Sequence, residues 1–160
     1  MGLSEDLERI EKQERELVLP RLDADVAWEL GSAMRAMAAE RKLAVVIDVR
    51  RFGQPLFYAA MEGTTPDNVE WVRRKNNVVA RFHCSSYYAG IKEKIKGQTL
   101  AEAQGLPVAD YATHGGAFPL AVADAGVVGS ATVSGLPMRQ DHELVIEALC
   151  KVLGAIGGRG

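Results

Sequence analysis

The sequence predicts an α+β fold in which a central antiparallel sheet is covered by helices. Two pairs of short apolar runs, each pair joined by a turn, have the length and spacing of hairpin strands. Long segments with helical spacing of apolar residues separate the pairs, which differs from the strand–helix alternation of a doubly wound parallel sheet. The run 43–47 shows little polar alternation, which indicates a sheet covered on both faces and therefore three α/β/α layers.

Length and composition are those of one globular domain spanning residues 1–160. The chain is 48% hydrophobic and 25% charged, with a formal net charge of −2, so nothing global favours nucleic acid or an anionic membrane. No apolar run approaches the roughly 18 residues that span a bilayer, and the first residues lack a secretory signal. Cys84 and Cys150 have no metal or redox spacing and are expected to be reduced thiols. We therefore expect a cytoplasmic protein.

Residues 1–18 are expected to form a surface helix that ends before Pro20. Acidic residues precede basic ones by four positions along it, a spacing that supports a solvated helix. Its thin apolar stripe fits either packing on the surface of its own domain or bridging to another subunit. Asp23 is a good N-cap for a second helix. The strands 43–49 and 56–61 then follow as an antiparallel hairpin.

Two arginines, Arg50 and Arg51, fall in the expected turn of this hairpin and are interpreted as solvated charges. A long basic helix should begin after Thr65 and run to about Ile95 without interruption. Its lysines and arginines form a solvated face, a face for anionic groups, or a complement to the acidic first helix of another copy. Aromatic interleaving is missing, which argues against nucleic-acid binding. A short capped helix is expected at 99–104.

The segment 111–149 organises the rest of the chain. It contains the strands 118–123 and 127–133, a glycine-bearing bend before the first strand and another after the second. A helix follows, with Arg139, Asp141 and His142 near its start. The final residues 157–160 are expected to be a mobile tail.

We expect the two bends to meet in space and to form a polar hollow. Backbone N–H groups at a strand-to-helix connection favour anions, and a guanidinium adds a bidentate donor. The residues expected to line the hollow are His114, Gly115, Gly116, Ser134, Gly135 and Arg139, with Arg74 or Lys75 contributing. The alternative is a plain connector in which Asp141 bonds the free amides.

Other site chemistries find little support in the sequence. Neither a Rossmann nor a P-loop fingerprint occurs, and the nucleophile elbow of lipases is missing around Ser134. His83, His114 and His142 have no ligand spacing for a metal, so no metal site is expected. His114, beside two glycines, is the one candidate for a general acid or base, a haem axial ligand or an anion donor. Its alternative is a hydrogen-bonded loop histidine, and His142 is interpreted as structural.

Two segments resemble a known family. His114–Pro119 (HGGAFP) and the stretch from Val128-Gly129-Ser130 to Asp141-His142 are similar to the haem-degrading-domain superfamily of HbpS-like and GlcG-like proteins. Within it, the chain resembles a branch of small single-domain proteins found in bacteria and fungi. The resemblance covers nearly the whole chain. GlcG-like proteins tend to have a plain Gly-Gly-x-Pro segment, where this chain carries His114 before the glycines and Ala117-Phe118 before Pro119.

The resemblance implies a profilin-like α/β domain, homo-oligomers built from dimers, and haem as a cofactor of some members. Our expectation is therefore a cytoplasmic homo-oligomer that binds a small anionic ligand, with haem as one form of that ligand. Two alternatives stand beside it. One is a non-catalytic oligomeric scaffold that presents surfaces to other proteins, and the other is a weak haem-degrading enzyme with His114 at its centre.

Overall fold

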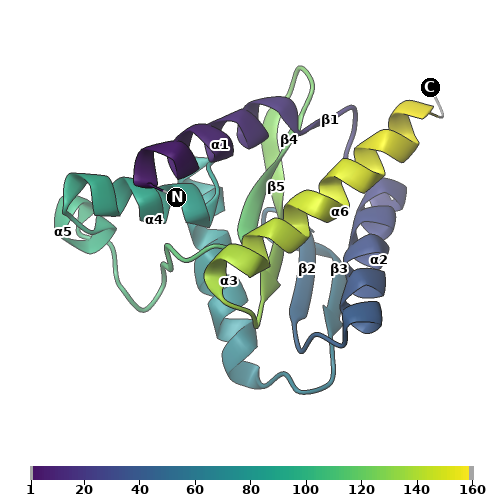
Figure 1. Ribbon diagram of the computed structural model, residues 1–160, viewed down its shortest axis with the longest axis horizontal. Coiled ribbons are helices and arrows are strands. Elements are labelled where there is room, and N and C mark those ends of the chain that lie inside the picture. The colour runs from purple at the N-terminus through teal and green to yellow at the C-terminus, as the bar shows by residue number, and fades with distance from the viewer. Residues whose placement is uncertain (1, 159–160) are drawn as a thin grey trace.

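Five strands form one sheet in the computed structural model, which describes residues 2–158 (Figure 1). The strand order is β1-β4-β5-β2-β3, and every neighbouring pair is antiparallel except β1 with β4. The bounds are β1 Val18–Leu19, β2 Val46–Arg51, β3 Gln54–Ala60, β4 Ala117–Val122 and β5 Gly126–Ser134. Both expected hairpins, β2–β3 and β4–β5, are confirmed. The short parallel edge strand β1 was not expected, because two residues carry no periodicity.

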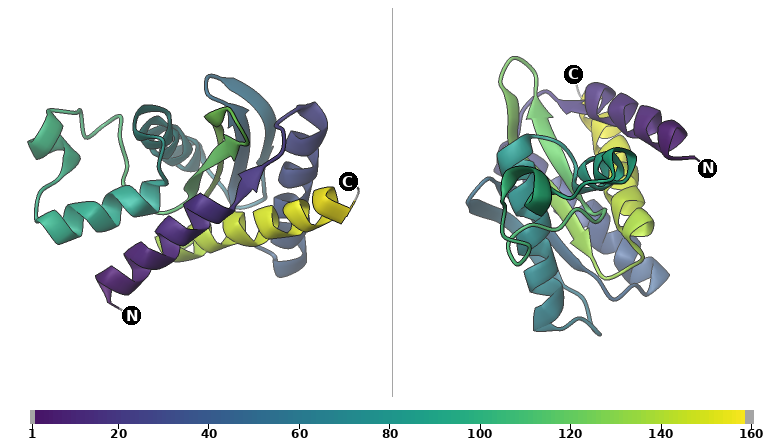
Figure 2. Two further views of the ribbon diagram at one scale, coloured as in Figure 1. Left: turned by 90° about the horizontal axis from the view of Figure 1, so that it is seen from above. Right: turned by 90° about the vertical axis from the view of Figure 1, so that its left-hand side faces the viewer.

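The helices confirm the three-layer arrangement. They are α1 Leu3–Glu16, α2 Ala24–Arg41, α3 Pro66–Phe82, α4 Ser86–Lys96, α5 Leu100–Gln104 and α6 Met138–Gly158. Helices α2 and α6 cover one face of the sheet and α3 covers the other, while α4 and α5 extend to one side (Figures 1 and 2). Because α6 continues to Gly158, half of the expected tail is helical, and residues 159–160 lie outside the described residues. No helix within residues 2–158 has the length and apolar character needed to span a bilayer.

The two faces of the sheet differ in chemistry because alternate residues of each strand point to opposite sides. The face under α2 and α6 supplies the apolar core, with Ile47, Val49, Phe118, Leu120, Ala131 and Val133. The face under α3 buries polar side chains instead. There the Asn76 amide of α3 donates to Asp48 at 2.9 Å, and its oxygen accepts from Ser130 and Thr132. The sheet face under α3 can therefore hold buried polar groups.

The prediction of one long basic helix from Thr65 to Ile95 is wrong, because this segment forms two helices, α3 and α4. His83 takes a left-handed conformation with φ 56°, which ends α3. Ser85 then caps α4, accepting a hydrogen bond from the Tyr88 amide at 3.0 Å. A single helical periodicity runs through both segments, so the break shows only in the local capping residues.

The β2–β3 turn is tighter than expected, and Arg50 is not a solvated turn charge. Strand β2 continues through Arg51, leaving only Phe52 and Gly53 between the strands. The Arg50 guanidinium donates two hydrogen bonds, each 2.8 Å, to the fully buried carboxylate of Asp48. This bidentate pairing satisfies a buried charge.

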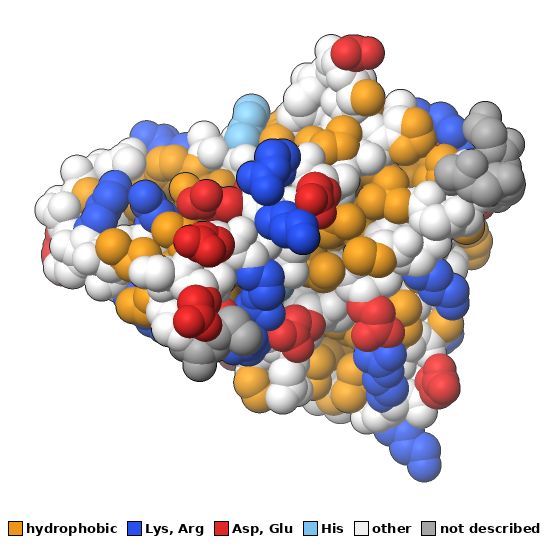
Figure 3. Space-filling model, turned by 45° about the horizontal axis from the view of Figure 1, so that its top comes forward, with side chains coloured by type: hydrophobic (Ala, Val, Ile, Leu, Met, Phe, Trp, Pro, Cys, Tyr) orange, Lys and Arg blue, Asp and Glu red, His pale blue; other side chains and the backbone are white. Residues whose placement is uncertain are grey.

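Helix α1 packs on its own chain, as the first of the two alternatives for this segment expects. Ile10 is buried against Tyr87 of α4, whose hydroxyl donates to Asp6 at 3.4 Å. Gln13 Oε1 lies 2.8 Å from Nε2 of the buried His142, which confirms a structural role for that histidine. On the face that Figure 3 shows, acidic and basic side chains are interspersed rather than gathered into a patch of one sign.

Candidate ligand-binding site

The two glycine-bearing bends come together, as expected, at one end of the β4–β5 hairpin. Antiparallel pairing places the start of β4 beside the end of β5, with Ala117 opposite Thr132. The Val133 amide donates to the Gly116 carbonyl at 3.1 Å, so the bends at 115–116 and 134–136 are neighbours. The first turn of α6 and the middle of α3 close the same region.

A polar hollow of about 280 Å³, here called the bend hollow, lies between these elements. Its lining residues come from α3, both bends and the start of α6: Asn68, Trp71, Lys75, His114, Ser134, Gly135, Leu136, Met138 and Asp141. Four of the residues expected from the sequence, His114, Ser134, Gly135 and Lys75, line it. Asn68 and Trp71 were missed, although successive intervals of three and four residues, from Asn68 to Trp71 and from Trp71 to Lys75, put all three on one helix face.

Lys75 and Asp141 form a buried ion pair at the wall of the bend hollow. Lys75 Nζ lies 3.1 Å from Asp141 Oδ2 and 3.2 Å from the Val133 carbonyl oxygen, to which it donates. The two side chains are 3% and 2% exposed. Burial lowers the pKa of Lys75 and raises the pKa of Asp141, and their mutual attraction offsets part of both shifts.

Asp141 also holds the strand-to-helix bend. Its Oδ1 accepts from the Leu136 amide at 2.9 Å, and its Oδ2 lies 3.4 Å from the Gly135 nitrogen. The backbone donors that were expected to serve a ligand are therefore already bonded. The connector alternative is the correct description of the 134–137 bend, and Asp141 stands where an external anion was expected.

The glycines of the first bend shape the site from behind. Gly116 has φ 139°, and a Cβ there would lie 2.3 Å from the Val133 oxygen and 2.7 Å from Lys75 Nζ. Gly115 has similarly little room, since its Cβ would lie 2.3 Å from the Met138 oxygen. Both positions therefore need glycine so that the lysine and the first turn of α6 can approach the bend.

His114 is exposed at the mouth of the hollow. Its ring meets Trp71 edge to face, with centroids 5.1 Å apart. Partial burial and the nearby charges of Lys75 and Arg74 lower the pKa of His114 below its ordinary value. The imidazole is therefore neutral at physiological pH, with one nitrogen able to donate and the other able to accept.

Arg139 and Arg74 do not line the bend hollow. Arg139 pairs with Glu143 at 3.1 Å and lies 3.8 Å from Asp6, on the side of α6 that faces α1. Arg74 stacks its guanidinium 4.7 Å from the Trp71 ring and donates to the Val108 carbonyl at 2.8 Å. It lines a smaller adjoining cavity, which it shares with His114. Within residues 2–158, no group of three His, Cys, Asp or Glu side chains is arranged as metal ligands.

Comparison with known proteins agrees with this fold. A UPF0303 protein of Burkholderia thailandensis is 62% identical over 154 residues, covering 96% of this chain and 93% of the relative. A UPF0303 protein of Paraburkholderia phymatum is 57% identical with the same coverage. The crystal structure of the Ybr137w protein superposes with a TM-score of 0.82 at 29% identity, covering 89% of this chain and 85% of that one.

A solved structure named as a PduOC:heme complex shares the fold, with a TM-score of 0.69 at 18% identity over 81% of this chain and 93% of the other. The family model described as haem degrading protein HbpS-like matches residues 22–150, which include both bends and the ion pair. The chain belongs to this HbpS-like family.

Proposed function

We propose that the protein binds a small anionic ligand in the bend hollow, at His114 and Lys75. The observation that carries this proposal is the placing of basic side chains around His114: Lys75 lines the bend hollow with it, and Arg74 lines the adjoining cavity that shares His114. Positive side chains that line one opening raise the local concentration of anions there.

Donors remain available for such a ligand after the internal bonds are counted. An ammonium has three N–H groups, and the Val133 oxygen and Asp141 occupy two of those of Lys75. The Ser134 hydroxyl lines the hollow and has no hydrogen-bond partner among residues 2–158. With the neutral His114 ring, three donor groups line a space at the small end of ligand pockets. A small carboxylate or phosphate suits it.

If the bound acid reacts, His114 is the residue that we assign as the proton acceptor. Its lowered pKa keeps it unprotonated at neutral pH, which is the form that a general base requires. The Lys75 ammonium would stabilise negative charge on the ligand.

Calorimetric titration with inorganic phosphate and with oxalate tests the binding proposal. His114→Ala removes an exposed side chain without opening the core, so it should weaken binding about tenfold or more while the protein stays folded. Arg139→Ala is the matched control, because Arg139 lies outside the hollow and should leave affinity unchanged. Saturable binding that His114→Ala leaves intact would overturn the assignment, as would the lack of binding by both probes.

Haem is the second candidate, favoured by the description of the family model and by the open, neutral imidazole of His114. The bend hollow is small and largely polar, whereas the macrocycle needs a broad apolar surface, so these residues fit a small acid better. Haemin titration followed at the Soret band separates the two. A saturable shift that His114→Ala removes would assign haem ligation there, and decay of that band with a reductant would indicate haem breakdown.

We further propose that the chain works as a cytoplasmic homo-oligomer built from dimers. Trp28 is 64% exposed on α2, beside β3 at the open edge of the sheet, and together they border a hollow of about 580 Å³. A large exposed indole next to an unpaired edge strand is typical of an interface. Trp28→Lys should lower the mass measured by light scattering, and an unchanged mass would exclude this face.

A further inference from the structure

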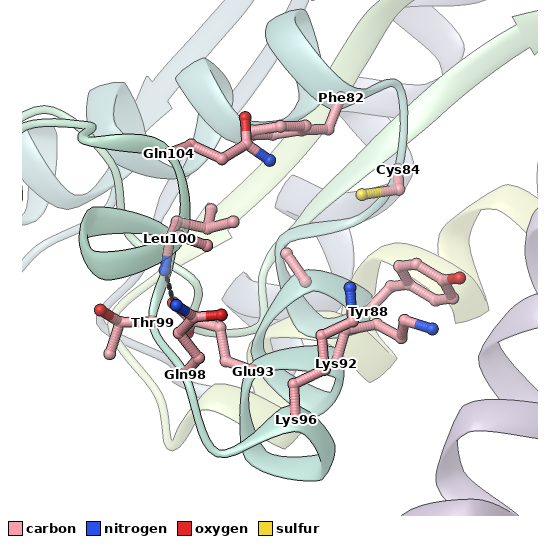
Figure 4. Close-up of a pocket in the computed structure, with 12 residues that line it drawn as sticks. Phe82, Cys84, Tyr88, Lys92, Glu93, Lys96, Gln98, Thr99, Leu100 and Gln104 are labelled. Carbon is pink, nitrogen blue, oxygen red and sulfur yellow. Dashed lines mark hydrogen bonds between the residues drawn. The ribbon is translucent and has the colours of Figure 1, made fainter.

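A second hollow, here called the α4–α5 groove, lies apart from the bend hollow and has a volume of about 300 Å³. It is bounded by the end of α3, one side of α4 and the short helix α5 (Figure 4). The side chains that carry the argument below are Phe82, Cys84, Tyr88, Lys92, Lys96 and Leu100. Nothing derived for the bend hollow uses any of them.

One end of the groove is mainly apolar, with the Gln104 amide as its polar exception (Figure 4). Phe82, Leu100 and Ala103 line it, and Figure 4 shows the Cys84 sulfur pointing into the space between α4 and α5. Burial, reinforced by the nearby Glu14, raises the pKa of Cys84 to about 12. The thiol is therefore uncharged at physiological pH and acts as a small hydrophobic group. This end of the groove suits a hydrocarbon chain.

The α4 wall carries positive charge. Tyr88, Lys92 and Lys96 follow at intervals of four residues, a spacing that places them on one side of the helix. Neither lysine forms an ion pair with any residue in the range 2–158. Glu93, the acid that also lines the groove, is already occupied, since it accepts from the Leu100 amide at 2.7 Å and from the Thr113 hydroxyl. Both ammonium groups are available to a ligand.

We propose that the α4–α5 groove binds an amphipathic monocarboxylate, a medium-chain fatty acid. Its hydrocarbon chain lies against Phe82, Cys84 and Leu100, and its carboxylate meets Lys92 and Lys96. An inorganic anion would leave the apolar end exposed, and a neutral hydrocarbon would leave the lysines unused. The volume is at the lower limit of small-molecule pockets, which favours a chain of medium length over a long one.

Calorimetric titration of the full chain with octanoate tests the charged end. The double variant Lys92→Gln/Lys96→Gln removes both charges from partly exposed side chains, and should weaken binding about five- to tenfold. Lys94→Gln is the matched control, because it removes the same charge from the same helix outside the groove and should leave affinity unchanged. His114→Ala separates the two sites and should also have no effect. Octanoate binding that is lost in His114→Ala, or unaffected by the double variant, would overturn the proposal.

The apolar end is tested by chain length and by thiol protection. Each methylene removed from octanoate should weaken binding by up to about fourfold, and octanol should bind more weakly than the acid. Bound octanoate should slow alkylation of Cys84, while the exposed Cys150 serves as an internal reference in the same sample. Equal rates for Cys84 with and without octanoate, or affinity independent of chain length, would contradict the proposed pose.

Discussion

The buried pair Lys75–Asp141 gives the sharpest prediction, because both residues line the bend hollow and their pairing also stabilises the fold. We expect Lys75→Met and Asp141→Asn each to lower the free energy of unfolding by about 3–5 kcal/mol, since each leaves one buried group without its partner. The double variant should lose clearly less than the two single losses together.

The magnitude follows from the geometry of the pair. At the observed 3.1 Å, two unit charges attract by about 5 kcal/mol with an effective dielectric constant of about 20. Desolvation of both groups, seen in the direction of their pKa shifts, cancels part of this attraction. A coupling energy of about 2–3 kcal/mol is therefore expected between the two substitutions.

Urea unfolding of the four proteins, followed by circular dichroism at neutral pH, measures this coupling. Asp141→Asn keeps an oxygen that can accept from the Leu136 amide, so its effect is restricted mainly to the charge. Equal slopes against urea would show that the losses come from the native state. Single-variant losses that add to within about 0.5 kcal/mol would refute the ion pair as an energetic unit.

Three further predictions concern titration and packing. Burial raises the pKa of Glu14 from 4.5 to about 7, so its stabilising contribution is complete below pH 4.5 and is lost as the pH rises through 7. Glu14→Gln should reduce the decline of the urea midpoint with rising pH, and the variant should be more stable than wild type above pH 7. Urea midpoints of variant and wild type that change with pH in the same way would contradict this. Gly31→Ala should lower the free energy of unfolding by about 1–3 kcal/mol, because its Cβ would lie 2.1 Å from the Phe57 ring. Gly154→Ala, whose Cβ would meet open space, should stabilise α6 by up to about 1 kcal/mol. Equal effects of the two substitutions in thermal melts would refute the steric argument. Gly116→Ala, at φ 139°, should lower the unfolding free energy by about 1–3 kcal/mol, and a neutral result in the same melts would remove the argument for a glycine requirement.

Periodicity in the sequence was sufficient for the hairpins and for α2 and α6. The apolar run 43–47 has the length of a strand buried on both faces, and Val133 lies between the polar residues Thr132 and Ser134, as in a strand with one apolar face. The α3–α4 break was missed because basic and apolar residues keep helical spacing across it. Only the left-handed conformation of His83 and the cap at Ser85 reveal it.

The bend hollow was predicted in position but not in its bonding. Antiparallel pairing of two adjacent strands must bring Gly116 and Val133 together, so their proximity followed from the hairpin. Arg139 is held away from the hollow by Glu143 of its own helix at 3.1 Å, with Asp6 of α1 at 3.8 Å. The role of Asp141 depended on Lys75, which is 66 residues away in the chain.

By itself the amino-acid sequence determined the elements and most neighbours in the sheet, because hydrophobic period, capping residues and short turns act over a few residues. Only the tertiary structure decided which charges pair and which remain open to a ligand. A charged side chain pairs with an opposite charge that packing brings within about 4 Å. For Lys75 that partner is Asp141, on a helix far away in the sequence. The long side chains of Lys92 and Lys96 find no such partner within residues 2–158, a property of the packed surface that no local pattern encodes.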